Sequence, residues 1–416
     1  MSDVVQLSVT KARPELWVST EPQVVYLHTI AQMTVTQRPQ TPLNLCLALD
    51  RSSSMRGERL YQVKEAARQV VNQLGPRDAF ALIAFNDRAE VIVPACTGAD
   101  HTALHVAISS LEARGGTEMA QGLSLGLREI ERPRLAGLNR LILLTDGRTY
   151  GDEQSCIELA RHAQRRGIGL TAFGVGTEWN EDLLEMIAAG ENSRTQYITS
   201  LDAIVPVFEA EIKRLRDTIA RHVELLVTTH PTVQIASLYR VQPFIAPLVP
   251  HLVNTGCWRV PLGDWVVGSE QQCLIELILP TCSPGQQSIA KLELRYETMG
   301  AKPAQFATDV SVDALALEEP ALAVEPDVRH VLERVTAYRL QAQAWEAVTK
   351  GRVAEATQTL QQAGMHLFNA GEIELAQTVH VEATRLLQNG SASTDGRKRI
   401  KYGTRGLIAG GKHADL

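Results

Sequence analysis

A short apolar run near the start of the sequence limits the folds open to this chain. Residues 43–49 are rich in leucine and end at Asp50. A strand that is apolar on both faces is typical of a parallel sheet covered by helices on both sides. Ser52 and Ser54 follow Asp50 at spacings of two and four, at the carboxyl end of the strand, where open α/β sheets bind ligands. The run therefore predicts an α/β fold with a ligand site beside Asp50.

The pattern after this run alternates between strands and helices as far as residue 218. A helix over 59–74 is indicated by an apolar stripe that includes Leu60, Val63 and Val70. Further strands are expected at 79–85, 89–93, 140–145, 169–175 and 196–199. Further helices are expected at 101–111, 118–131, 153–166, 180–189 and 202–218. This alternation predicts a doubly wound, mainly parallel, Rossmann-like sheet.

The segments on either side of this region have different patterns. Residues 1–40 and 219–320 contain strand-like runs without helices, so they predict one antiparallel β-sandwich. The α/β domain at 41–218 would then be inserted in this sandwich or lie beside it. Residues 325–389 predict a C-terminal α-helical bundle of hairpins, similar in their Ala, Leu and Gly positions to tetratricopeptide hairpins but too few to form a solenoid, so that they lean on another domain. Residues 390–416 are rich in Gly and Ser with a basic cluster, and we expect a disordered tail.

Composition and charge narrow the functional classes. The net charge of −6 argues against general nucleic-acid binding, which requires a basic surface. No apolar run approaches the roughly 20 residues of a membrane span, and the first residues lack the basic and apolar regions of a secretory signal. The six cysteines form no CxxC pair, so we expect reduced thiols and a cytoplasmic protein without a membrane partner.

Hydroxyl and carboxyl side chains recur at the expected strand ends. Asp50, Ser52 and Ser54 offer hard oxygen atoms, which suit Mg²⁺. A single loop cannot supply six oxygens, and two further candidates are Thr117, after a pair of glycines, and Asp146, at the end of a strand. The alternative is that the hydroxyls and Asp50 cap helices and that Asp146 begins an ordinary turn. Both interpretations stay open on these residues alone.

The three segments together resemble a known family. Asp50-Arg51-Ser52-Ser53-Ser54, Gly116-Thr117 and Thr145-Asp146-Gly147 resemble, in order and spacing across 42–216, the metal-ion-dependent adhesion site (MIDAS) of von Willebrand factor A (VWA) domains of the bacterial cytoplasmic type. The resemblance implies direct ligation of Mg²⁺, with Mn²⁺ or Ca²⁺ as substitutes, by Ser52, Ser54 and Thr117. It implies that Asp50 and Asp146 act largely through water, and that a partner protein fills an open coordination position with an Asp or Glu. Arg51 and Ser53 are unusual residues at their positions.

The function expected from this resemblance is a metal-dependent protein–protein interaction module, acting as an adaptor or as an assembly or signalling component rather than as an enzyme. The alternative is a metal-dependent hydrolase or phosphatase that uses the same cation. It requires a general base, and the histidines of the α/β region, His101, His105 and His162, all lie in expected helices. The sequence contains no Walker A or His-Glu-x-x-His motif.

Two kinds of partner are suggested beyond the acidic ligand. VWA proteins of the bacterial cytoplasm often work with MoxR-type ATPases, which the resemblance suggests here. In the basic tail, Thr404 stands three residues before Leu407, a spacing similar to that of phosphothreonine peptides bound by forkhead-associated domains. Phosphorylation would add about two negative charges beside the basic cluster. Binding of nucleic acid by that short cluster has little support in an acidic protein.

Overall fold

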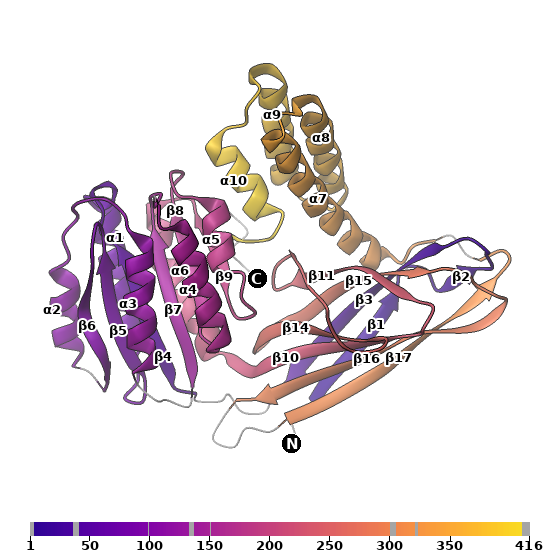
Figure 1. The fold of residues 1–416 in the computed structure, drawn as a ribbon, viewed down its shortest axis with the longest axis horizontal. Helices are drawn as coiled ribbons and strands as arrows, with labels where there is room; N and C mark the ends of the chain where they lie inside the picture. Colours follow the sequence, from indigo (N-terminus) through magenta and orange to yellow (C-terminus); the bar gives the residue numbers. More distant parts are fainter. Residues whose placement is uncertain are drawn as a thin grey trace. The chain divides into compact units, whose positions relative to one another are not determined.

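The computed structural model describes residues 4–35, 41–98, 100–132, 137–149, 151–299, 305–320 and 323–409. The chain divides into two compact units (Figure 1). One unit consists of Met1–Pro39 and Thr218–Gly406, and the other of Gln40–Asp217 and Leu407–Leu416. In sequence, the main part of the second unit is therefore an insertion into the first, and its last segment follows the first unit. Among the described residues, no helix is long and apolar enough to cross a membrane.

The inserted unit is built on a seven-stranded sheet with the order β18-β9-β8-β7-β4-β5-β6. All neighbours are parallel except β5 and β6. The strands are β4 (Leu43–Asp50), β5 (Ala79–Phe85), β6 (Ala89–Thr97), β7 (Leu138–Thr145), β8 (Gly169–Val175), β9 (Arg194–Ile198) and β18 (Ile408–Ala409). Every residue of β4 is buried, because β5 and β7 flank it in the sheet and helices cover both faces. The predicted doubly wound, mainly parallel sheet is confirmed.

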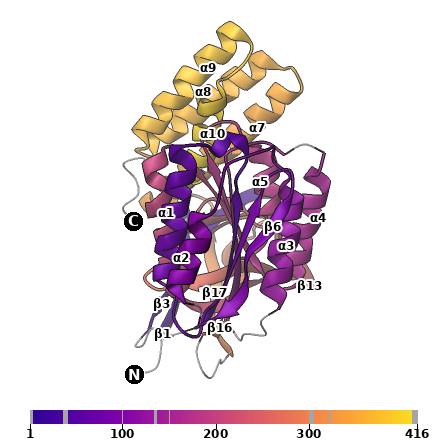
Figure 2. The ribbon, with the colours of Figure 1, turned by 90° about the vertical axis from the view of Figure 1, so that its left-hand side faces the viewer.

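Helices cover this sheet on both faces. Figure 2 shows α1 and α2 on one face and α3 and α4 on the other, and α6 packs beside α1. The helices are α1 (Glu58–Asn72), α2 (His101–Ser109), α3 (Met119–Glu131), α4 (Glu153–Arg165), α5 (Glu181–Ile187) and α6 (Ile204–Arg216), with short 3₁₀ turns at Ser53–Met55 and Leu201–Ala203. The apolar stripe expected on the first helix is buried at Leu60, Val63 and Val70.

A buried ion cluster ties α6 to the sheet. The Glu211 carboxylate on α6 is fully buried and lies 2.7 Å from the guanidinium groups of Arg194, on β9, and Arg214. It also accepts a hydrogen bond of 2.7 Å from Thr171 Oγ1 on β8. Burial by itself would raise the pKa of Glu211, but the charges of Arg194 and Arg214 and these hydrogen bonds outweigh it and hold the pKa well below its usual value. The ionised carboxylate therefore stabilises the folded unit.

The other unit contains two packed β-sheets. One has the order β1-β3-β15-β11-β12 and the other β13-β14-β10-β16-β17-β2. The strands are β1 (Val4–Lys11), β2 (Glu15–Trp17), β3 (Gln23–Thr34), β10 (Thr218–Thr229), β11 (Gln234–Gln242), β12 (Ala246–Pro247), β13 (His251–Asn254), β14 (Cys257–Val266), β15 (Glu270–Leu279), β16 (Gly285–Thr298) and β17 (Gln305–Leu317). Because β1 and β3 enter one sheet and β2 enters the other, the N-terminal segment completes the sandwich, as expected.

In the described part of the chain, four helices come after the sandwich. They are α7 (Pro326–Thr349), α8 (Val353–Asn369), α9 (Ile373–Asn389) and α10 (Thr394–Gly403). Val328, Val331 and Val335 of α7 share an apolar cluster with Val241 and Leu274 of the sandwich. The expectation that these helices lean on another domain is therefore confirmed for α7.

The expectation of a disordered tail from residue 390 is wrong for the described part of that segment. Ser393 caps α10 by accepting a hydrogen bond from the Gly396 N–H, and Ile400 and Tyr402 are buried. Beyond α10, β18 adds a parallel edge strand beside β9. The Gly- and Ser-rich composition reflects the short loop before α10, whereas burial of apolar side chains orders α10 itself. Residues 410–416 lie outside the described residues.

Candidate metal centre

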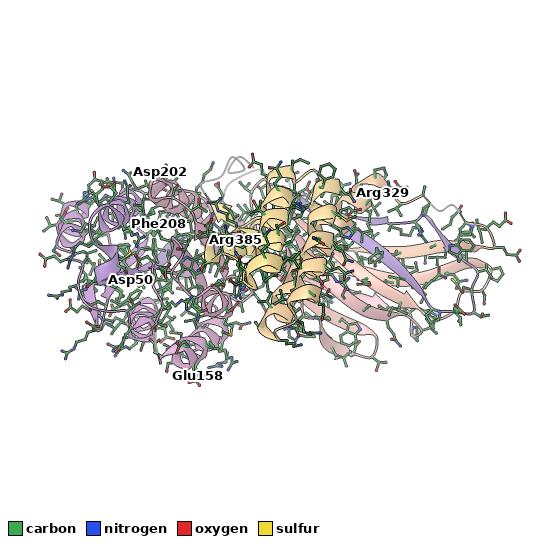
Figure 3. All side chains as sticks on the ribbon, turned by 90° about the horizontal axis from the view of Figure 1, so that it is seen from above. Asp50, Glu158, Asp202, Phe208, Arg329 and Arg385 are labelled. Carbon is green, nitrogen blue, oxygen red and sulfur yellow. The ribbon has the colours of Figure 1, made fainter. Side chains whose placement is uncertain are left out.

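The carboxyl ends of β4 and β7 bring two carboxylates together. Asp50 is the last residue of β4, which pairs in parallel register with β7, so that Leu49 lies beside Leu144. Thr145 ends β7 and Asp146 follows it. Both Asp50, labelled in Figure 3, and Asp146 are at most 1% exposed. Two buried carboxylates at one sheet edge repel each other unless hydrogen-bond donors or a cation compensate their charge.

Hydroxyl groups link the two carboxylates in a chain. Ser52 Oγ lies 2.9 Å from Ser54 Oγ, and Ser54 Oγ donates to Asp146 Oδ1 at 2.6 Å. Asp50 Oδ1 accepts from the Ser52 N–H at 2.7 Å, and Asp50 Oδ2 accepts from Thr145 Oγ1 at 2.6 Å. These bonds fix the carboxylates and both serine hydroxyls in one cluster of oxygen atoms.

Thr117 reaches the same cluster from a third loop. A Cβ atom built on Gly147 would lie 3.4 Å from Thr117 Oγ1 and 3.9 Å from Ser54 Oγ. The absence of a side chain at Gly147 thus leaves room for these two hydroxyls beside the Asp146 loop. The structure brings together all five residues selected from the sequence, namely Asp50, Ser52, Ser54, Thr117 and Asp146.

Backbone hydrogen bonds hold the Thr117 loop against the Asp50 loop. The Arg114 N–H donates to the Arg51 carbonyl at 2.8 Å, and the Ser53 N–H donates to the Gly115 carbonyl at 2.9 Å. Gly115 has a positive φ of 74°, and a Cβ atom there would overlap the carboxylate of Asp87. Gly115, the first of the two glycines before Thr117, therefore allows the positive φ and the close approach that the sequence suggested.

The helix-capping alternative is wrong for the serines and the threonine. Helix α1 has Gly57 at its N-cap, without a capping side-chain hydrogen bond. Helix α3 has Glu118 at its N-cap, also without one, and Ser52 precedes its 3₁₀ turn without one. The hydroxyls of Ser52, Ser54 and Thr117 are thus not used to satisfy helix ends.

Burial dominates the electrostatics of Asp50. It raises the pKa of Asp50 to about 6, against the opposing hydrogen bonds from Thr145 and Ser52, while the nearby Asp146 contributes in the same direction as burial. An ionised carboxylate in this position is unfavourable unless positive charge lies close to it. A cation beside the hydroxyls would supply that charge.

The donor set suits one hard cation. Each of the five side chains offers only oxygen, which Mg²⁺, Mn²⁺ and Ca²⁺ prefer over nitrogen or sulfur. Within the described ranges, no three His, Cys, Asp or Glu side chains gather at one point. Any cation at this sheet edge would therefore depend on hydroxyl ligands as well as on the two carboxylates.

Comparison with known proteins agrees with this geometry. Residues 44–208 match the model of the von Willebrand factor type A domain, and residues 326–410 match that of the Sll0103-like, C-terminal alpha-helical domain. The uncharacterized protein sll0103 of Synechocystis sp. is 30% identical over 371 residues, which cover 86% of this chain and 87% of that protein. The chain belongs to this family of VWA-domain proteins.

More distant relatives share part of the chain or its fold. The uncharacterized protein YfbK of Escherichia coli is 28% identical over 194 residues, which cover 45% of this chain and 34% of YfbK. A solved von Willebrand factor type A structure from Catenulispora acidiphila superimposes with a TM-score of 0.76 over 97% of both chains, at 15% sequence identity. The second likeness shows that the fold is shared along almost the whole chain. VWA domains typically mediate protein–protein interaction, which is the coarse function of this one.

Two arginines beside the VWA site were missed as site residues by sequence reasoning. Arg59, the second residue of α1, places Nη1 2.5 Å from Asp146 Oδ2 and 3.2 Å from the Ser54 carbonyl. Arg51 is buried and forms an ion pair of 2.7 Å with Glu90 on β6, which explains an unusual residue at that position. A signal for Arg59 was present, because a cation in the first turn of a helix opposes the helix dipole and needs another reason to be there.

The hydrogen bonds described for the histidines of the VWA domain do not involve the five candidate site residues. His101 and His105 belong to α2 and His162 to α4, as expected. His162 lies 3.1 Å from Glu131 and lines a groove between α3 and α4, beside Glu158 (labelled in Figure 3). That groove contains none of the five site residues. No observation in the described residues favours the hydrolase alternative.

Thr404 does not form part of an exposed linear motif. It follows α10, is 4% exposed, and donates its hydroxyl to the Ile400 carbonyl at 2.9 Å. A kinase requires an accessible hydroxyl on an extended segment, so the end of α10 would have to unfold first. The expectation of a displayed phosphothreonine site is therefore wrong for this conformation, and the forkhead-associated partner loses its structural support.

Proposed function

We propose that the VWA domain holds one divalent cation, Mg²⁺ in the first place and Mn²⁺ or Ca²⁺ as substitutes, and uses it to bind a carboxylate of a partner protein. The side chains that would hold the ion are Asp50, Ser52, Ser54, Thr117 and Asp146. The observation that carries the proposal is the convergence of three hydroxyls and two buried carboxylates from three loops, where the hydroxyls cap no helix.

The five side chains would have different roles in holding the ion. Ser52, Ser54 and Thr117 are neutral, so they would leave the ion's positive charge largely uncompensated. Asp50 is held by the Ser52 N–H and the Thr145 hydroxyl, which keeps its oxygens oriented and suits a role through bridging water. When bound, the ion supplies a coordination position with strong affinity for an anionic oxygen. An Asp or Glu side chain of a partner protein has the matching charge and hardness.

The wider role that we propose is that of an adaptor or of an assembly or signalling component in the bacterial cytoplasm, with a MoxR-type ATPase as one candidate partner. The burial of four of the six free thiols, those of Cys46, Cys156, Cys273 and Cys282, is in keeping with a reducing compartment. The acidic net charge of −6 is in keeping with a protein rather than a nucleic-acid partner.

A binding experiment tests the proposal. Immobilised full-length protein is incubated with cell extract in Mg²⁺ or in EDTA, and the affinity for each retained protein is then measured with the purified pair. Asp50→Ala removes a proposed site residue, and Asp202→Ala is the matched control, because Asp202 is exposed in the same unit (Figure 3). We expect a partner whose binding is lost in EDTA and with Asp50→Ala but kept with Asp202→Ala. Affinity that is unchanged in EDTA and with Asp50→Ala would contradict the proposal.

A further inference from the structure

Arg59 is the charged side chain in closest contact with the proposed cation site. Its Nη1 bonds Asp146 Oδ2 at 2.5 Å and the Ser54 carbonyl at 3.2 Å. The side chain is 37% exposed, whereas Asp146 is buried. Arg59 therefore extends from solvent to a buried carboxylate of the site. An ordinary ion pair on a helix surface would instead join two exposed side chains.

The two oxygens of Asp146 have separate partners. Oδ1 accepts from Ser54 Oγ at 2.6 Å and so faces the hydroxyl cluster, whereas Oδ2 faces the guanidinium. Arg59 thus does not occupy the oxygen that points to the cluster. A cation among the hydroxyls and the guanidinium on Oδ2 are therefore compatible.

The other donors of Arg59 remain free within the described part of the chain. Neither Nε nor Nη2 makes a hydrogen bond to a described residue. Nη2 lies beside Gly176, where an added Cβ atom would be 3.7 Å away. A glycine at this position leaves space next to the guanidinium. The fork of donors on a guanidinium matches the two oxygens of a carboxylate.

Charge balance shows what such an arrangement favours. Asp50 and Asp146 contribute two negative charges, which a divalent cation would neutralise, and Arg59 then leaves one positive charge in excess. The guanidinium repels the cation and attracts an anion. The same side chain should therefore weaken the binding of the metal alone and strengthen the binding of an acidic ligand to the loaded site.

We propose that Arg59 is a specificity-determining residue of the site, which provides a second contact for the carboxylate of the partner. The inference rests on the proposed function, because it assumes a cation among the five side chains. It adds that the site favours an anionic ligand through the charge of Arg59 as well as through the charge of the metal. Neutral oxygen ligands, such as a glutamine amide, gain nothing from Arg59.

Mn²⁺ binding measures both effects on the full-length protein. The EPR signal of free Mn²⁺ gives its affinity, first alone and then with a capped Gly-Glu-Gly tripeptide, with Gly-Gln-Gly as the control peptide. For Arg59→Gln we expect Mn²⁺ alone to bind about three- to tenfold more tightly, and the tightening caused by the Glu peptide to shrink by a similar factor. Arg59→Lys keeps the charge, so Mn²⁺ alone should bind about as in the wild type, but without the fork of donors the tightening caused by the Glu peptide should be smaller. Arg68→Gln, on the same helix and paired with Glu65, should change neither value.

The outcomes separate the two proposals. If Arg59→Gln weakens Mn²⁺ binding, or leaves the affinity and the peptide effect unchanged, the inference about Arg59 is overturned while the metal site stands. If the wild type binds no Mn²⁺, or if Asp50→Asn binds it equally well, the proposed function itself fails. Changes of opposite sign in the two measurements cannot come from a general loss of stability, which would weaken both.

Discussion

Replacing Asp50 with Asn separates a structural role of this residue from a role in metal binding. Asn keeps the shape of the side chain but carries no charge. Because burial raises the pKa of Asp50 to about 6 from its ordinary value of 3.8, its contribution to stability is fully present below the unfolded value and is lost as the pH rises through about 6. A difference of about two pKa units corresponds to about 3 kcal/mol. In EDTA at pH 8, Asp50→Asn should therefore be more stable than the wild type, by up to about 3 kcal/mol.

Mg²⁺ should reverse this order. Metal at a hundred times its dissociation constant stabilises a protein by about 2.7 kcal/mol, and only the wild type should gain. The assay is urea denaturation read by hydrogen exchange of peptides from β4 and β5, which report on the α/β unit alone. An Asp50→Asn variant clearly less stable than the wild type in EDTA at pH 8, or equal stabilisation of both proteins by Mg²⁺, would refute this reasoning. Asp202→Asn, at an exposed site, is the control.

Other predictions concern the packing of the same unit. Glu211→Gln leaves Arg194, whose side chain is 20% exposed, without its buried charge partner, so we expect a loss of up to about 3–5 kcal/mol in urea denaturation. The exposed Glu209→Gln on the same helix should cost almost nothing, and a loss below about 1 kcal/mol for Glu211→Gln would be inconsistent with the buried cluster. Because the pKa of Glu211 is lowered in the folded state, its stabilisation is fully present above its unfolded pKa and is lost progressively as the pH falls from there through the folded pKa. The stability gap between wild type and Glu211→Gln should therefore narrow in acid, and a constant gap would disagree. Gly174→Ala places a Cβ atom against the buried Trp179 ring. This overpacking should lower the free energy of unfolding by about 1–3 kcal/mol in the same assay. An unchanged midpoint would show that the ring can move.

The α/β fold and the five candidate site residues could be predicted because their signals are local. The continuous apolar run of β4 is required by burial on both faces of a parallel sheet, and the chain direction of such strands puts their carboxyl ends at one edge. Asp50 and Asp146 then had to be neighbours. Thr117 was selected because it follows a pair of glycines, and the resemblance to a known motif supported it, but its loop position depends on the glycine at 115 and on contacts that no spacing rule specifies.

Other features depend on contacts between distant segments. Helix α10 was missed because its stability comes from the burial of Ile400 and Tyr402 rather than from strong local propensity. Thr145 bonds Asp50 only because the register of β4 and β7 places it there. The place of Arg59 in the first turn of a helix was a signal, but only the folded chain places Asp146 at the end of its side chain.

Our central proposal is that loops after β4 and β7 and before α3 together hold one divalent cation. A crystal structure of the protein soaked in Mn²⁺, with data collected for the anomalous signal of manganese, tests it most directly. We predict a peak bounded by Ser52 Oγ, Ser54 Oγ and Thr117 Oγ1, with water between the ion and both carboxylates and a remaining position open to solvent. An empty cluster beside peaks elsewhere on the surface, at saturating Mn²⁺, would contradict it.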